Sequence, residues 1–367
     1  MIAAFIFMGI SSSYALPRFA LRMGARCIDC HIDPTGGGMR NKGGWHFGWK
    51  VLPLVSPRDN SFKMDNHIAD NIEVGLDYRT QYVYSQQFGK TAFQKMEGTI
   101  YTNVDLSDEI NAYAQYDFVN QTWEAFAVAH ILPNESYIKA GSFQPDFGLR
   151  IDDHTAYTRG GDLGYLFTTN KRQGLIYDPR YDITGVELGY NIDDVGLITA
   201  SVGSPVNLNF NSDPTYTASF MVNPVIASKV AVMLGASYTN FQGPLIYTQV
   251  PTEHKINMYG GYAGFGVGNF TLMGEYDIAQ DYESVGTNSA AMMLKGSYRI
   301  VKGLEGIVRY DKFDPNTSVS GDEVSRLIVG AEFFPYSFVE VRPQYRFQFE
   351  SPSVKNDVFL VQFHFYY

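Results

Sequence analysis

Two cysteines and a histidine close together near the N-terminus are the residues of this chain best suited to chemistry. They form the run Cys27-Ile28-Asp29-Cys30-His31, and the chain contains no other cysteine. Two thiols separated by two residues, with a histidine directly behind, are the pattern of covalent c-type haem attachment. The thiols bond the porphyrin edge, and the histidine ligates the iron from one face. The sequence therefore predicts one covalent haem c on Cys27 and Cys30, with His31 as the proximal iron ligand.

Three other interpretations of the cysteine pair are weaker. A disulfide between Cys27 and Cys30 would close a very short loop and constrain little. A thioredoxin-like redox pair needs a βαβ context, which the surrounding sequence does not provide. A zinc site needs two further ligands, for which the chain offers only scattered histidines. No carboxylate cluster has ligand spacing within one segment, so no metal beyond the haem iron is predicted.

The sequence leaves the distal ligand of the iron open. His46, fifteen residues beyond His31, is the first candidate, and Met39 is the second. A methionine would raise the reduction potential relative to ligation by two histidines. Each candidate also has an ordinary role, because histidine forms hydrogen bonds and methionine fills space in a core. Further candidates are Met23, Met64 and His67.

Most of the chain after the motif alternates between apolar and polar residues. In the segment 339–349, valine, tyrosine and phenylalanine alternate with glutamate, arginine and glutamine. About sixteen such segments can be counted, each near the ~9–11 residues that a tilted membrane-spanning strand needs. The chain is also rich in Gly (35), Tyr (26) and Phe (26), and no apolar run reaches the length of a spanning helix. The sequence thus predicts an all-β protein, a transmembrane antiparallel barrel of about sixteen strands.

The connections between these segments alternate in length, as the turns and loops of outer-membrane barrels do. The longest connection covers residues 143–181. A loop of this length in a compact protein is usually functional or disordered. We expect it to fold into the barrel as a constriction, and the alternative is a flap outside the pore. The side chains expected near the pore are Arg150, Asp152, Asp153, His154 and Arg159.

Three regions follow along the chain. Residues 1–15 are apolar and end in small residues, which indicates a signal peptide. Residues 16–66 carry the haem motif and are too few for a cytochrome core of their own, so we expect them to plug the barrel. Residues 67–367 are the expected barrel, in the bacterial outer membrane and in contact with its lipid. The net charge of −10 does not favour nucleic acid as a partner.

The residues around the motif resemble a known family. Leu16-Pro17, Phe19-Ala20, the C-x-x-C-H run and then Pro34, Asn41, Gly44 and Phe47 are similar to the haem segment of fused outer-membrane monohaem cytochrome–porins. That family includes the iron-oxidising outer-membrane cytochromes. The detailed match covers about 35 residues, and the barrel resembles the family by architecture alone. The run Thr35-Gly36-Gly37-Gly38 departs from the pattern of the iron oxidisers.

The resemblance implies electron transfer across the outer membrane. The implied partners are a periplasmic carrier, such as a soluble c-type cytochrome, and an extracellular electron donor or acceptor. Ferrous iron is one implied donor, in which case the protein would act as an Fe(II) oxidase. Two alternatives stay open: a porin whose haem plug is structural or a redox gate, and a sleeve that docks other cytochromes.

Overall fold

The computed structural model describes residues 17–57, 65–151, 153, 155–161, 174–175, 182–205, 213–227, 230–242 and 255–367. The expected signal peptide, the loop residues Asp152 and His154, and the distal-ligand candidate Met64 lie outside these ranges. In the described part of the chain, no helix has the length and apolar character needed to cross a membrane.

The described strands form one antiparallel sheet. Its 18 strands include two three-residue pieces, β1 (His67–Ala69) and β10 (Val225–Ala227), which leaves sixteen long strands. The long strands are β2 (Ile72–Ser85), β3 (Lys90–Asp105), β4 (Ile110–Asp117), β5 (Thr122–Ala129), β6 (Tyr137–Phe143), β7 (Ile183–Ile192), β8 (Gly196–Pro205), β9 (Thr215–Val222), β11 (Val230–Gln242), β12 (Lys255–Val267), β13 (Phe270–Gln280), β14 (Asn288–Val301), β15 (Leu304–Asp314), β16 (Val324–Phe333), β17 (Val339–Phe349) and β18 (Val358–Tyr366).

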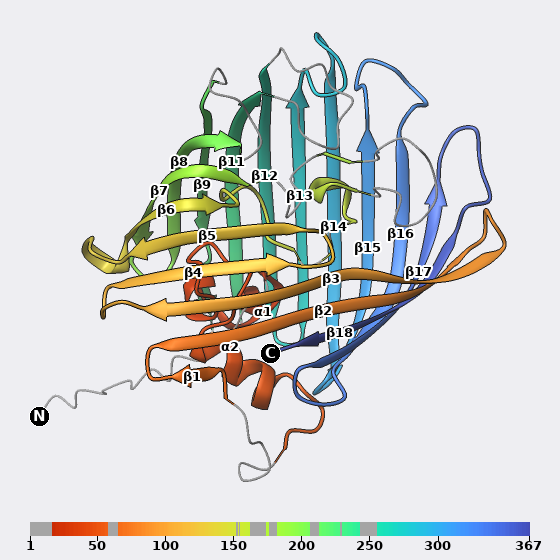
Figure 1. The fold of residues 1–367 in the computed structure, drawn as a ribbon. Coiled ribbons are helices and arrows are strands. Elements are labelled where there is room, and N and C mark those ends of the chain that lie inside the picture. Colours follow the sequence, from red (N-terminus) through yellow and green to blue (C-terminus); the bar gives the residue numbers. More distant parts are fainter. Residues whose placement is uncertain are drawn as a thin grey trace, which may run out of the picture.

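The sheet closes on itself. Each long strand pairs with its neighbour in the chain, and the last strand β18 pairs with the first, β2, from Val358–Ser85 to Tyr366–Asp77. Figure 1 shows the resulting barrel, with the blue β18 beside the orange β2. The prediction of an antiparallel barrel of about sixteen strands is therefore confirmed.

Burial along the strands is the inverse of that in a soluble protein. In β17, Glu340, Arg342 and Arg346 are at most 3% exposed, whereas Tyr345 and Phe347 are 37% and 38% exposed. The same outward apolar face recurs around the barrel, for example at Leu76, Ile100, Leu188, Leu234, Tyr259, Leu294 and Val308. An apolar exterior around a polar interior is the arrangement of a barrel whose outer wall meets lipid.

The two ends of the barrel differ. At one end the connections are tight, such as Lys302-Gly303 between β14 and β15. At the other end they are mostly longer, although the β4–β5 hairpin there is tight, with Gln121 at φ 59° in its turn. Short turns lie on the periplasmic side of outer-membrane barrels, which assigns the first end to the periplasm.

The N-terminal segment (residues 17–57) occupies the short-turn end. Its elements are α1 (Pro17–Met23), η1 (Cys27–Asp29), α2 (Lys42–His46) and the π-helical turn η2 (Phe47–Val51). Its last residues join the barrel rim, where the Leu54 amide donates to the Phe334 carbonyl at 2.8 Å and Val55 bridges to Tyr336. Figure 1 shows α1 and α2 at this end, next to the C-terminus.

Helix α1 lies against the inner wall of the barrel because glycines leave room for it. Leu21 is fully buried and packs with Met233 and Met273. A Cβ on Gly264 would lie 2.9 Å from the Leu21 side chain, and one on Gly266 would lie 2.7 Å from its carbonyl oxygen. Both glycines belong to β12, so this strand has no side chains in the way where α1 packs against its backbone.

Candidate functional site

The Cys27–His31 stretch folds into one tight turn. The amides of Cys30 and His31 both donate to the carbonyl oxygen of Cys27, at 3.1 and 3.0 Å. At the start of the turn the Arg26 amide donates to Asp29 Oδ2 at 2.8 Å. The two thiols are not joined in a disulfide. The turn thus holds the two cysteines and the histidine in one compact unit.

The two thiols have different surroundings. Cys30 is fully buried and packs with Phe19 and Phe47 of the N-terminal segment and with Phe334 of the barrel rim. Cys27 lines a cavity, and burial raises the pKa of its thiol to about 12. A thiol with so high a pKa stays protonated at neutral pH, whereas thiol–disulfide exchange needs the thiolate. The environment therefore does not favour the redox-pair interpretation.

The chain continues from the motif into a hairpin that returns to it. His31 pairs with Arg40 in an antiparallel bridge, and the Ile32 amide donates to the Met39 carbonyl at 3.1 Å. Residues opposite each other in such a pair point to the same side, so His31 and Arg40 share one face of the hairpin. Met39 lies on the other face and is buried with Tyr101 and Tyr113.

The tip of this hairpin is the run Gly36-Gly37-Gly38. Their φ angles are +91°, +81° and +57°, a region that glycine adopts at little cost. A Cβ on Gly36 would lie 3.4 Å from Cys27 Sγ, and one on Gly37 would lie 3.3 Å from Arg150 Nη1. The glycines therefore give the turn and let the backbone lie close to the Cys27 thiol.

Asn41 and Gly44 hold helix α2 against the motif. Asn41 Oδ1 caps the helix by accepting from the amides of Gly43 and Gly44 at 2.9 and 3.1 Å, while its Nδ2 donates to the Ile28 carbonyl at 2.7 Å. A Cβ on Gly44 would lie 2.3 Å from the Cys30 carbonyl oxygen, so only glycine allows this approach. Asn41 and Gly44, two of the residues on which the family resemblance rests, thus each have a structural role in holding α2 against the motif.

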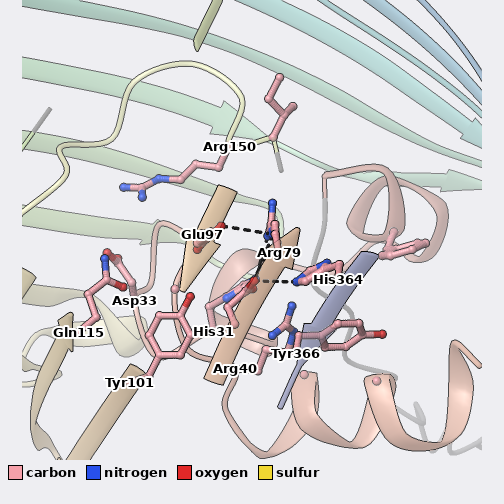
Figure 2. Close-up of a pocket in the computed structure, with 18 of the residues that line it drawn as sticks. His31, Asp33, Arg40, Arg79, Glu97, Tyr101, Gln115, Arg150, His364 and Tyr366 are labelled. Atoms are coloured by element: carbon pink, nitrogen blue, oxygen red, sulfur yellow. Dashed lines mark hydrogen bonds and ion pairs between the residues drawn. The ribbon is translucent and has the colours of Figure 1, made fainter. Parts of the chain in front are cut away.

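His31 faces two adjoining cavities in the lumen. The larger has about 1440 Å³ of space not filled by atoms, and the smaller, which Cys27 lines, has about 620 Å³, part of each being open to solvent. His31, Gly36, Gly37 and Arg150 line both cavities. The larger one has an apolar wall of Phe19, Phe47, Leu52 and Phe334, and charged side chains from the strands face it in Figure 2.

The two distal-ligand candidates lie apart from the larger cavity. His46 is exposed and lines a separate cleft at the short-turn end, which His31, Trp45 and Trp49 also line. Met39 is 2% exposed within its aromatic cluster. A third imidazole, His364 on β18, lines the larger cavity with His31. The distal ligand thus stays a prediction.

His364 was missed by the sequence reasoning. Its Nε2 lies 2.8 Å from Asp77 Oδ1, and its Nδ1 lies 3.0 Å from Glu340 Oε2. Both ring nitrogens therefore face carboxylates. The only signal in the sequence was a lumen-facing histidine in the last strand, and alternation alone did not distinguish it from other polar positions.

Buried charge pairs attach the N-terminal segment to the barrel wall. Lys139 Nζ on β6 lies 3.2 Å from Asp33 Oδ1 and 2.8 Å from Glu187 Oε1 on β7. Burial opposes ionisation of Asp33, but Lys139 and Arg150 outweigh it and lower the pKa of that carboxyl group. Lys139 is fully buried and was also missed, because nothing in the sequence relates it to the motif.

A second set of pairs lies on the opposite wall. Arg22 Nη1 is 2.6 Å from Glu305 Oε1 on β15, and Arg18 Nε is 3.4 Å from Glu305 Oε2. Arg18 also pairs with Glu332 on β16. Helix α1 is therefore fixed by ion pairs on its cationic side and by Leu21 on its apolar side.

The inward loop (the described residues 144–151, 153 and 155–161) follows β6 and runs inside the barrel. Arg159 Nη2 lies 2.6 Å from Glu275 Oε1 on β13, and Asp153 Oδ2 lies 2.8 Å from Arg309 Nη1 on β15. Arg150 donates to Gln144 Oε1 at 3.0 Å and belongs to the cavity wall. The structure thus brings three of the five predicted loop residues into the lumen, and Asp152 and His154 lie outside the described residues.

The Asp153 carboxylate is surrounded by arginines. Burial opposes its ionisation, but Arg309, Arg346 and Arg326 outweigh that effect and hold the pKa of Asp153 well below its usual value. Arg346 Nη2 lies 3.4 Å from Asp153 Oδ2.

Among the described ranges, no group of three or more histidine, cysteine, aspartate or glutamate side chains is placed to hold a metal ion.

No protein-family model matches this chain, and no curated protein matches it. Solved structures match along the barrel. OmpT of Vibrio cholerae, expressed in the outer membrane, is 12% identical with a TM-score of 0.57, over 83% of this chain and 100% of that one. The outer-membrane channel DcaP of Acinetobacter baumannii is 11% identical with a TM-score of 0.57, over 83% and 100%. OprB of Pseudomonas putida is 10% identical with a TM-score of 0.60, over 81% and 94%.

This chain has the fold of an outer-membrane porin. The likeness covers the barrel and shows its architecture. The apolar side chains on the outside of this barrel need to contact lipid, because they would otherwise be exposed to water. Together these observations place the protein in the bacterial outer membrane, as the sequence predicted.

Proposed function

We propose that this protein transfers electrons in the outer membrane through one covalent haem c held inside its porin-like barrel. The observation that supports the proposal most is the position of the C-x-x-C-H turn. Its histidine faces two connected cavities of the lumen, and Cys27 lines one of them. The residues present fit the group, because the Cys27 thiol, the His31 imidazole and a bare glycine turn line adjoining cavities, and the Cys30 thiol packs against Phe19, Phe47 and Phe334, the apolar wall of the larger one.

Each residue would have a distinct role. Cys27 and Cys30 would form the two thioether bonds, and His31 would ligate the iron. Phe19, Phe47 and other apolar residues of the wall would exclude water from one side of the cavity. When bound, haem supplies one-electron redox chemistry that needs no substrate pocket.

Two routes lead from His31 toward the ends of the barrel. The cleft at the short-turn end, which His31 shares with Trp45 and His46, opens where a periplasmic carrier such as a soluble c-type cytochrome would approach. Phe147 and Arg159 of the inward loop line the larger cavity on its other side. An extracellular donor or acceptor, ferrous iron among the donors, would exchange electrons from that side.

Replacing both cysteines tests the attachment. We expect the Cys27→Ala, Cys30→Ala double variant to lose haem staining completely while the barrel still folds, because neither thiol forms a disulfide. Mass spectrometry of the mature wild-type chain should show one added porphyrin. An unmodified wild-type chain, or haem stain that persists in the double variant, would overturn the proposal.

A porin is the second candidate function, and the fold favours it. The two functions are separated in liposomes that carry the purified haem-loaded protein and a trapped acceptor. An external reductant too large to pass the pore, such as a reduced soluble c-type cytochrome, should reduce the trapped acceptor if the protein conducts electrons. Solute-driven swelling without reduction of the acceptor would favour the porin instead.

The two segments that lie inside the barrel bear on the choice between electron transfer and a porin. The N-terminal segment packs against the wall at β11–β13, and the inward loop crosses to β13, β15 and β17. Both are fixed by buried ion pairs. We therefore expect slow swelling in wild-type liposomes.

A further inference from the structure

Several arginines face the larger cavity beside His31, and most of them serve the protein's own polar groups. Arg79 Nε lies 3.1 Å from Asp77 Oδ1 and 3.3 Å from Glu97 Oε2. Arg159 lies 2.6 Å from Glu275. Their positive charges are therefore compensated within the barrel wall.

Arg40 has a different environment. It pairs with His31 across the hairpin, so the two side chains leave the backbone on the same face. Its guanidinium lies 4.3 Å over the ring of Tyr366, which fixes its direction without neutralising it. Among the described residues no carboxylate lies within ion-pair distance of Arg40, and Asp77, on which its charge acts, is already paired with Arg79 and His364. Figure 2 shows it between His31 and Tyr366 at the cavity.

The chemistry of haem c identifies what this cation would bind. The two cysteines attach at the vinyl positions, and two propionate carboxylates extend from the opposite edge of the porphyrin. Arg40 lines the larger cavity, which adjoins the one that Cys27 lines, so a porphyrin attached at Cys27 would have room to present its opposite edge to Arg40. A guanidinium fork matches the geometry of a carboxylate and binds it with two parallel hydrogen bonds.

We propose that Arg40 binds a haem propionate and raises the reduction potential of the haem. The inference rests on the proposed function, since it needs the covalent haem. Tyr366 positions the guanidinium from the last strand, so closure of the barrel completes this site. A positive charge beside the porphyrin favours the reduced iron, which carries one positive charge less than the oxidised iron.

The test is a spectroelectrochemical titration of the purified haem-loaded protein at one pH and ionic strength. Arg40→Gln and Arg40→Met both remove the charge, and methionine retains an apolar stem over the Tyr366 ring. The matched control is Lys42→Gln, which removes the same charge from an exposed position two residues along the same segment. We expect both Arg40 variants to keep the haem and to shift the reduction equilibrium about tenfold toward the oxidised form, which is 59 mV for one electron.

The outcomes separate this inference from the function on which it rests. Wild-type protein without covalent haem would overturn both. Wild-type protein with haem, and Arg40 variants whose potential equals that of Lys42→Gln, would overturn the role of Arg40 alone. If Arg40→Gln does not fold, Arg40→Met decides the question, and a potential unchanged from wild type contradicts the proposal.

Discussion

The N-terminal segment and the inward loop both enter the lumen, but their acidic anchors have opposite surroundings. Asp33 of the N-terminal segment forms an ion pair with one lysine, Lys139, which it shares with Glu187, and Arg150 also favours its ionised form. Asp153 of the inward loop meets Arg309 and Arg346 at 2.8 and 3.4 Å, with Arg326 nearby. One anchor thus has two acids around a single lysine, and the other has one acid among several arginines.

This difference teaches where each attachment is vulnerable. Removing a cation from a buried pair leaves an uncompensated charge, which costs far more than the pair itself contributes. At Asp33 one substitution removes the lysine shared by two carboxylates. At Asp153 the remaining arginines still compensate the charge. The segment with the haem motif is therefore the less tolerant of the two.

The largest effect is expected for Lys139→Met. It leaves Asp33 and Glu187 buried without this cation, and we expect the N-terminal segment to detach more easily by about 3–5 kcal/mol. Native-state proteolysis, with cleavage mapped to residues 17–57, measures this opening.

The control for this variant is Lys255→Met, whose pair with Asp213 at 2.8 Å is half exposed. Exposed pairs contribute little, so we expect no measurable change there. Equal cleavage in the Lys139 and Lys255 variants would show that the buried lysine does not hold the segment.

A smaller effect is expected for Arg346→Gln. It removes one hydrogen bond to Asp153 and one to Thr155 Oγ1 at 2.8 Å, but Arg309 stays in place. We expect the inward loop to open more easily by about 1–2 kcal/mol, measured as proteolysis within residues 144–161. If Arg346→Gln eased opening of the inward loop as much as Lys139→Met eases detachment of the N-terminal segment, the claimed difference between the two anchors would be contradicted.

The fold was predictable because the strands of a barrel wall alternate apolar and polar residues along the sequence. Period-two patterning gave the strand number, and the contrast between short and long connections gave the two ends. The motif itself was also readable, because Cys27, Cys30 and His31 lie within five residues and make their turn locally. Arg150, Asp153 and Arg159 were found because a long polar loop is visible as a break in the pattern.

The other residues of the site could not be predicted from the sequence, because closure of the barrel is what brings them together. His364 and Tyr366 reach the cavity only since β18 pairs with β2, and Lys139 meets Asp33 across about a hundred residues of chain. Along a strand, these side chains look like any other inward position. The direction of His46 was also hidden, because α2 continues into a π-helical turn that leaves it in a different cleft from the larger cavity.

The smallest effect concerns pH and sharpens the contrast on the side of the inward loop. The folded-state pKa of Asp153 lies well below 3.8, so its stabilising contribution is complete above the usual pKa and is lost as the pH falls through the folded value. We therefore expect loop docking to be constant between about pH 5 and 8 and to weaken only below 3.8. Cleavage of residues 144–161 by pepsin across acidic pH measures this.

Asp153→Asn is the matched variant for the pH experiment. It removes the titrating group while keeping the size of the side chain, so pepsin should cleave its loop at every acidic pH with no step below 3.8. A wild-type loop that is already cleaved at about pH 5 would mean that the arginines around Asp153 do not hold its carboxylate in the ionised form. The redundancy that distinguishes this anchor from the single lysine at Asp33 would then be absent.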